Sequence, residues 1–145
     1  MKGPDAVKLK FLREAALVLA LATTSVTLCA PHSQAQTEAP KAVLVQYSAE
    51  TDLKALSAKG KTVVFFFATW CPNCVLTLTE LSQKWSEVDP AITLVIADYD
   101  TETALKAEYG VTYQDTFVLL DAEAKAAKLW NAGGVAGLNE NVRTQ

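Results

Sequence analysis

Histidine and cysteine are scarce in this sequence, and their placement limits the kinds of site it can build. The 145 residues include one histidine and three cysteines. Cys29 and His32 lie near the N-terminus, so residues 43–145 contain only Cys71 and Cys74 and no histidine. A buried metal centre would find few of its usual ligands there. We therefore expect no metal and no cofactor beyond the thiol pair.

Clustered positive charge is missing as well. The chain has 13 basic and 16 acidic residues, a formal net charge of −3, and no basic stripe. This balance gives no sign of a nucleic-acid partner. Half of the residues are hydrophobic, and we find no internal repeat. The length and composition therefore predict one globular domain with a substantial core, which we expect to be monomeric.

The first 35 residues have the pattern of a secretory signal. Four basic residues lie before Glu14, an uncharged and mostly apolar run extends from Ala15 to Ala30, and Ser33 and Ala35 offer small side chains for cleavage. We expect residues 1–35 to be a signal peptide that is removed, and the protein to be periplasmic or extracellular. The alternative is an uncleaved membrane anchor, although 16 apolar residues are fewer than the roughly 20 that span a bilayer.

The remaining chain is predicted to consist of a linker at residues 36–42 and one domain at residues 43–145. Apolar patterning predicts strands at 43–47, 62–67, 91–97, 116–120 and 126–130, and helices at 49–59, 72–88, 101–109 and 135–142. Strands that alternate with helices pair in parallel through right-handed crossovers, whereas the last two strands, joined by a short turn, pair antiparallel. The prediction is an α/β fold with a central mixed sheet of four to five strands and helices on both faces.

Two helix features are predicted in more detail. Ser48 is the expected cap of the first helix. Val75, Leu78, Leu81, Trp85 and Val88 recur at intervals of three and four residues and are the expected inward face of the second helix.

The pair Cys71 and Cys74 carries the chemistry that the sequence suggests. An apolar strand ends just before it, and Pro72 suits the first position of the helix that follows. The unpaired N–H groups at a helix N-terminus favour a thiolate, so Cys71 is the expected nucleophile. Cys74, one helical turn later, is the expected resolving thiol. Asn73 adds no positive charge, and the pair alone would also fit half of a zinc site or a structural disulfide.

In combination, these residues resemble the thioredoxin superfamily. The resemblance is carried by Phe67-Ala68-Thr69-Trp70-Cys71-Pro72-Asn73-Cys74, Asp98-Tyr99-Asp100, Tyr109-Gly110-Val111 and Thr116-Phe117-Val118, and it extends from Val43 to the end. It implies a thioredoxin-like fold and a redox-active disulfide between Cys71 and Cys74. It also implies protein thiols and disulfides as substrates, and a site whose mouth is shaped by Trp70.

Two departures from the family pattern affect the same site. Phe65 and Ile96 occupy the positions where many thioredoxins keep a buried acid and its basic partner. Asp115 stands where the family has a cis-proline, so Gln114 and Asp115 form the loop that faces the cysteines in the family. A cis peptide without proline costs roughly 3 kcal/mol, and we expect the Gln114–Asp115 peptide to be trans.

The Asp115 carboxylate has several possible roles. Near the thiols it would disfavour the Cys71 thiolate by repulsion. It would also be able to accept a proton from Cys74, or to add an oxygen ligand for a metal. Alternatively, Asp115 turns outward as an ordinary loop residue.

The sequence thus predicts an exported thiol–disulfide oxidoreductase that acts through Cys71 and Cys74. The lack of a histidine between the cysteines, together with Asp115, favours a reductant over a strong oxidant. A reductant in an oxidising compartment needs an electron donor, for which a membrane thiol carrier is the expected partner. The alternatives are a copper-binding or metal-delivery protein on the same fold, and a redox-inert interaction module.

Overall fold

The computed structural model describes residues 39–143 as one α/β unit. The predicted signal peptide and the first residues of the linker lie outside the described residues. The elements are β1 (Val43–Gln46), α2 (Leu53–Ser57), β2 (Lys61–Phe67), α3 (Pro72–Gln83), a 3₁₀ turn (Trp85–Glu87), β3 (Ile92–Asp98), α4 (Thr103–Tyr109), β4 (Thr116–Leu120), β5 (Ala126–Asn131) and α5 (Gly134–Arg143). Within residues 39–143, no helix is both long and apolar enough to cross a membrane.

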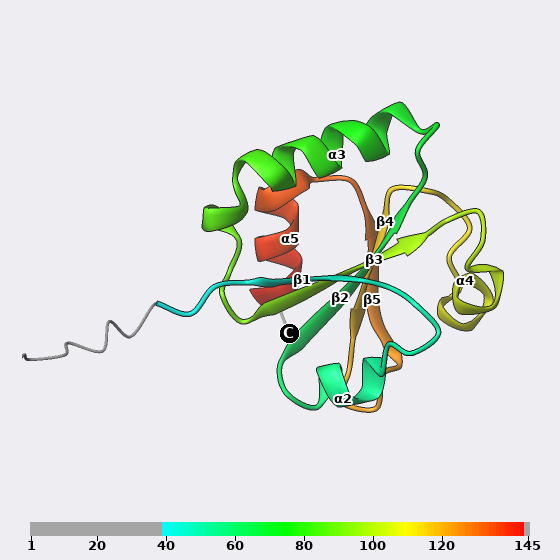
Figure 1. The fold of residues 1–145 in the computed structure, drawn as a ribbon, viewed down its shortest axis with the longest axis horizontal. Helices are drawn as coiled ribbons and strands as arrows, with labels where there is room; N and C mark the ends of the chain where they lie inside the picture. Colours follow the sequence, from blue (N-terminus) through cyan, green and yellow to red (C-terminus); the bar gives the residue numbers. More distant parts are fainter. Residues whose placement is uncertain (1–38, 144–145) are drawn as a thin grey trace, which may run out of the picture. The chain divides into compact units, whose positions relative to one another are not determined.

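The five strands form one mixed sheet in the order β1-β3-β2-β4-β5 (Figure 1). β1 and β2 run parallel to β3, whereas β4 runs antiparallel to both β2 and β5. The predicted fold class is confirmed, but the expectation that a crossover would make β4 parallel is wrong. The seven residues of α4 span about 10 Å as a helix, and the seven residues of β3 span about 23 Å as a strand. The helix is too short to carry the chain back to the edge of the sheet where β3 began. β4 therefore starts at the edge where β3 ends and runs in the opposite direction.

Helices cover both faces of the sheet and give the unit two hydrophobic cores (Figure 1). On one face, Val63 and Phe65 of β2 pack in a cluster with Leu81 of α3 and Leu138 of α5. On the other face, Val64 and Phe66 pack with residues of α2 and α4, such as Leu53 and Leu105. Residues Thr62 to Phe66 are fully buried, because β2 lies between two strands and two helical layers. The predicted position of this strand at the centre of the sheet is confirmed.

An aromatic column crosses the sheet on the α3/α5 face. The ring centroids of Phe65 and Phe117 lie 4.4 Å apart, and those of Phe117 and Trp130 lie 5.4 Å apart, with nearly parallel rings in both pairs. The strand register places these residues side by side on β2, β4 and β5. Stacked pairs of this kind add about 0.5–1.5 kcal/mol each beyond the burial of their area.

Two local predictions need correction. The first helix begins after Asp52, whose carboxylate accepts a hydrogen bond from the N–H of Ala55 at 2.8 Å. Ser48 does not cap it, because the Thr51 N–H donates to the Ser48 carbonyl and closes a turn before the helix starts.

The inward face of α3 is also different from the prediction. It consists of Cys74, Thr77 and Leu81, while Val75 is exposed. The polar Thr77 lies inward because the loop that contains Asp115 packs there.

Candidate functional site

Cys71 ends the loop after β2 and caps α3. Its Sγ accepts a hydrogen bond from the Cys74 N–H at 3.2 Å, and its own N–H donates to the Ala68 carbonyl at 3.2 Å. Pro72 occupies the first position of the helix, as predicted. Both cysteines are free thiols in this structure. The cap geometry aims a backbone N–H and the positive end of the helix at the Cys71 sulfur, and both favour its thiolate.

Cys74 lies deeper than Cys71, one turn along α3. Its side chain is fully buried, and the Cys71 side chain is 3% exposed. Burial is the main reason that the pKa of Cys74 is raised to about 12; its hydrogen bond to Cys71 and the charges of Cys71 and Asp115 act in the same direction. Cys74 is therefore a protonated thiol at neutral pH, and it needs a proton acceptor before it can act as a nucleophile.

Exposed apolar side chains lie in the segments next to the cysteines, namely the residue before Cys71, the first turns of α3 and the loop before β4. Trp70, Val75, Leu76 and Tyr113 are 59%, 44%, 67% and 68% exposed, and we refer to these four residues as the apolar rim. Pro72 and Asn73 are also exposed, at the first turn of α3. A buried sulfur beside an exposed apolar rim suits contact with a protein surface.

Trp70 is held in place by a residue whose role the sequence did not reveal. The indole Nε1–H of Trp70 donates to Asp100 Oδ2 at 2.8 Å. Asp98, two residues earlier, accepts hydrogen bonds from the backbone N–H groups of Asp100 and Thr101, whereas the Asp100 carboxylate accepts the bond from Trp70. No sequence signal marks this bond, because it joins residues 30 positions apart.

The loop before β4 is fixed through its backbone. The Asp115 N–H donates to the Phe66 carbonyl at 3.1 Å, and the Asp115 carbonyl accepts from the Ala132 N–H at 3.1 Å. Asn131 donates to the Gln114 carbonyl at 3.4 Å. The Gln114–Asp115 peptide is trans, as predicted. Asp115 adopts a left-handed backbone with φ of 59°, which asparagine and aspartate tolerate better than most residues.

These backbone bonds turn the Asp115 side chain inward. It is 5% exposed, so the alternative of an outward-facing loop residue is wrong. Its Oδ1 is buried without a hydrogen-bond partner among the described residues. Burial raises the pKa of Asp115, and a hydrogen bond with the Thr77 side chain opposes that effect. Because Thr77 and Cys74 lie on the same face of α3, the carboxyl group is at the inner side of the thiol pair.

Phe65 lies in the aromatic column, and Ile96 is its register partner on β3. The two positions at which the family resemblance led us to look for a buried acid and base are therefore apolar neighbours. Asp115, from a different element, is the carboxyl group whose charge acts on Cys74.

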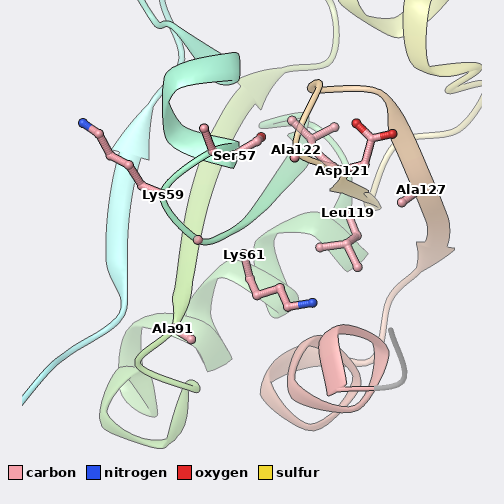
Figure 2. A pocket seen from close by; sticks show the side chains of 11 residues that line it. Ser57, Lys59, Lys61, Ala91, Leu119, Asp121, Ala122 and Ala127 are labelled. Carbon is pink, nitrogen blue, oxygen red and sulfur yellow. The ribbon is translucent and has the colours of Figure 1, made fainter.

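A pocket in residues 39–143 lies away from the cysteines. It has a volume of about 450 Å³ and is lined by Lys59 and Lys61 near the start of β2, by Ala91, and by Asp121 after β4 (Figure 2). The cysteines follow the opposite end of β2. The Lys59 and Lys61 side chains extend in different directions (Figure 2), so they do not converge on one ligand.

A metal site was one of the alternatives for the thiol pair. Within residues 39–143, no three His, Cys, Asp or Glu side chains lie close enough together to hold a metal ion. Asp115 thus does not complete a ligand set with the cysteines.

Comparison with known proteins identifies related chains. The Thioredoxin family model matches residues 41–144. Thioredoxin Asp f 28 of Aspergillus fumigatus is 33% identical over 94 residues, which are 63% of this chain and 83% of that protein.

Solved structures of thioredoxins have a similar fold. The thioredoxin of Fasciola hepatica superposes with a TM-score of 0.51 at 26% identity, over 59% of this chain and 81% of its own. The oxidized form of mitochondrial thioredoxin 3 of Saccharomyces cerevisiae superposes with a TM-score of 0.58 at 22% identity, over 70% of this chain and 95% of its own.

Proposed function

The chain belongs to the thioredoxin family and is a thiol–disulfide oxidoreductase, and on that premise we propose that Cys71 and Cys74 exchange disulfides with protein substrates as a reductant outside the cytoplasm. The observation that carries the assignment to these two residues is the hydrogen bond from the Cys74 N–H to the Cys71 sulfur at the start of α3. It singles out one sulfur that is favoured as a thiolate and one that is not.

The reaction has two steps. The Cys71 thiolate attacks a substrate disulfide, forms a mixed disulfide with one substrate sulfur and releases the other as a thiolate. The Cys74 sulfur, after losing its proton, then attacks Cys71 Sγ. This closes the Cys71–Cys74 disulfide and releases the second substrate thiolate, so the substrate gains the two electrons that the protein loses.

The apolar rim supports a protein as the substrate. Its four side chains are exposed in the segments next to the Cys71 sulfur, which is nearly buried, so a partner that reaches this sulfur is expected to contact them. Covering exposed apolar groups of this kind with a partner surface lowers the free energy of the complex. The Trp70–Asp100 bond keeps one side of the rim fixed before the partner arrives.

The proposed direction follows from the surroundings of the sulfurs. Strong oxidants of this kind stabilise their reduced form by lowering the pKa of the thiols. Here Asn73 carries no charge, the pKa of Cys74 is raised, and a carboxyl group lies nearby. The raised pKa disfavours the Cys74 thiolate and so favours electron donation. A membrane thiol carrier would then re-reduce the pair.

The proposed location rests on the N-terminal sequence, with its basic opening, apolar run and cleavage signal after Ala35. Expression of the full chain in a bacterium, followed by fractionation and N-terminal sequencing, tests it. We expect a periplasmic protein that begins at Gln36. A cytoplasmic protein with an intact N-terminus would contradict this part of the proposal.

The central experiment measures reduction of a protein disulfide by the reduced protein. Cys71→Ser is expected to abolish it. Cys74→Ser is expected to trap a covalent mixed disulfide between Cys71 and the substrate, because only the second step is blocked. An added reductant should cleave this disulfide. Titration of the Cys71–Cys74 couple against glutathione should give a reduction potential near that of thioredoxin, about −270 mV. The assignment would be refuted by a wild-type protein that does not reduce the disulfide and whose Cys71 and Cys74 thiols do not become oxidised.

A further inference from the structure

We propose that the Asp115 carboxylate is the proton acceptor for Cys74 when Cys74 resolves the mixed disulfide. This inference rests on the proposed function and adds a third reacting group to it. It assigns the task to the loop before β4, since the buried positions of the central strand, Thr62 to Phe66, carry no carboxyl group.

Cys74 needs an internal acceptor because it has no contact with solvent. Its side chain is fully buried, and it packs with Ala68, Cys71 and Phe67 at the end of β2 and with Tyr99 after β3. Tyr99 already donates its hydroxyl proton to the Thr112 carbonyl at 3.0 Å. Two charged groups act on the thiol, Cys71 and Asp115. At this step the Cys71 sulfur is bonded to the substrate sulfur in the mixed disulfide and cannot accept the proton. The Asp115 carboxylate can accept it.

The other acids at this end of the sheet are engaged elsewhere. Asp98, the last residue of β3, and Asp100 just after it are both exposed. One accepts backbone hydrogen bonds from residues 100 and 101, and the other accepts the indole proton of Trp70.

Asp115 is prepared for the role by its contacts. The backbone bonds to Phe66 and Ala132 hold the residue between β2 and β5, and the Thr77 side chain holds the carboxyl group. Oδ1 has no hydrogen-bond partner in the described part of the chain, so it has lone pairs available for a proton. Burial raises the pKa of Asp115 and makes it a stronger base than an aspartate in water.

The step balances without any further reactant. The Cys74 S–H bond breaks and its proton moves to Asp115. The Cys74 electron pair forms the bond to Cys71 Sγ, and the bond between Cys71 and the substrate sulfur breaks with its electrons on the leaving thiolate. Asp115 then returns its proton to that thiolate or to water, and the cycle restores the carboxylate.

A two-phase rapid-mixing experiment separates the steps. An aromatic disulfide whose thiolate is coloured releases one equivalent when Cys71 attacks and a second when Cys74 resolves the mixed disulfide. Asp115→Asn is expected to leave the first phase within about threefold of wild type and to slow the second by about 100-fold or more at neutral pH, the lower end of the usual contribution of a general base. The loss should shrink toward alkaline pH, because hydroxide then removes the Cys74 proton.

Two further variants exclude a merely structural effect. Glu123→Gln makes the same charge change at an exposed turn residue and should leave both phases unchanged. Thr77→Val removes the hydrogen bond that lowers the pKa of Asp115. It should therefore move the acid limb of the second phase to higher pH. Asparagine suits the left-handed backbone at residue 115, so the fold should survive, which circular dichroism checks.

Each contrary result has a defined meaning. A second phase in Asp115→Asn within twofold of wild type overturns the inference. A slowing that is the same at every pH also overturns it, as does an acid limb that Thr77→Val leaves in place. A wild-type protein that shows neither phase instead refutes the proposed function, so the two failures are distinguishable.

Discussion

Replacing Asp115 with asparagine should stabilise the protein at neutral pH, and the gain should vanish in acid. Burial raises the pKa of Asp115 above its ordinary value of 3.8, so the folded protein holds this proton more tightly than the unfolded chain does. Its contribution to stability is therefore complete below the unfolded pKa and is lost as the pH rises through the folded pKa. Asparagine has no proton to lose.

The size of the effect follows from the burial of the carboxylate. Asp115 is 5% exposed and its Oδ1 has no partner among the described residues. A buried polar group without a partner costs about 1–3 kcal/mol, and more when it is charged. Asparagine keeps the shape, tolerates the φ of 59° and removes the charge. We expect it to raise the free energy of unfolding by at least about 1 kcal/mol at neutral pH.

Urea unfolding of the reduced proteins between pH 3 and pH 8 measures this difference. Each unit by which the folded pKa of Asp115 exceeds the unfolded one adds about 1.4 kcal/mol to the gain. Asp98→Asn is the matched control with the opposite sign. Hydrogen bonds from the backbone N–H groups of Thr101 and Asp100 lower the pKa of Asp98, so this variant should be less stable than wild type at neutral pH and equal to it in acid. An Asp115→Asn protein that is less stable at neutral pH, or a difference that does not change with pH, would refute the reasoning.

Three other predictions concern the rim and the core. Asp100→Ala removes the acceptor of the Trp70 indole and should raise KM for a protein substrate by roughly 3- to 10-fold, the worth of one hydrogen bond, with kcat nearly unchanged in steady-state assays. Leu76→Glu places a charge on the apolar rim and should lower kcat/KM by roughly 10-fold, whereas Leu129→Glu, at a residue exposed on β5, should not; equal losses would remove the rim from substrate binding. Phe117→Ala opens the middle of the aromatic column and should lower the free energy of unfolding by about 3–5 kcal/mol in urea, a loss below about 1 kcal/mol being contrary.

Local patterns were sufficient to predict the centre of the site. The apolar run of β2, Pro72 and the spacing of Cys71 and Cys74 lie within a dozen residues of one another, so the sequence contains the strand, the helix start and the order of the two thiols. The fold class followed from the same kind of signal, the alternation of strand and helix patterns.

Contacts between distant segments were not predictable in this way. The inward turn of Asp115 depends on the Phe66 carbonyl and the Ala132 N–H, which belong to two other parts of the chain. The direction of β4 depends on how far a short helix can carry the backbone. The Trp70–Asp100 bond joins two loops that are distant in the sequence. The local sequence of each loop accounts for its residues without this bond, so nothing in either loop predicts it.

The edge position of β1 has a consequence for the order in which the chain can fold. Among the described strands, β1 pairs with β3 alone, in parallel, and Gln46 is the register partner of Ile96, 50 residues away. A strand with no local partner must wait until its distant neighbour has been synthesised and has folded onto β2. β1 precedes the other four strands of this sheet in the chain, yet it is expected to be the last of the five to join. If residues 1–35 direct export, the part of the domain nearest to that signal stays extended longest, and an extended chain is the form that can be threaded through a membrane channel.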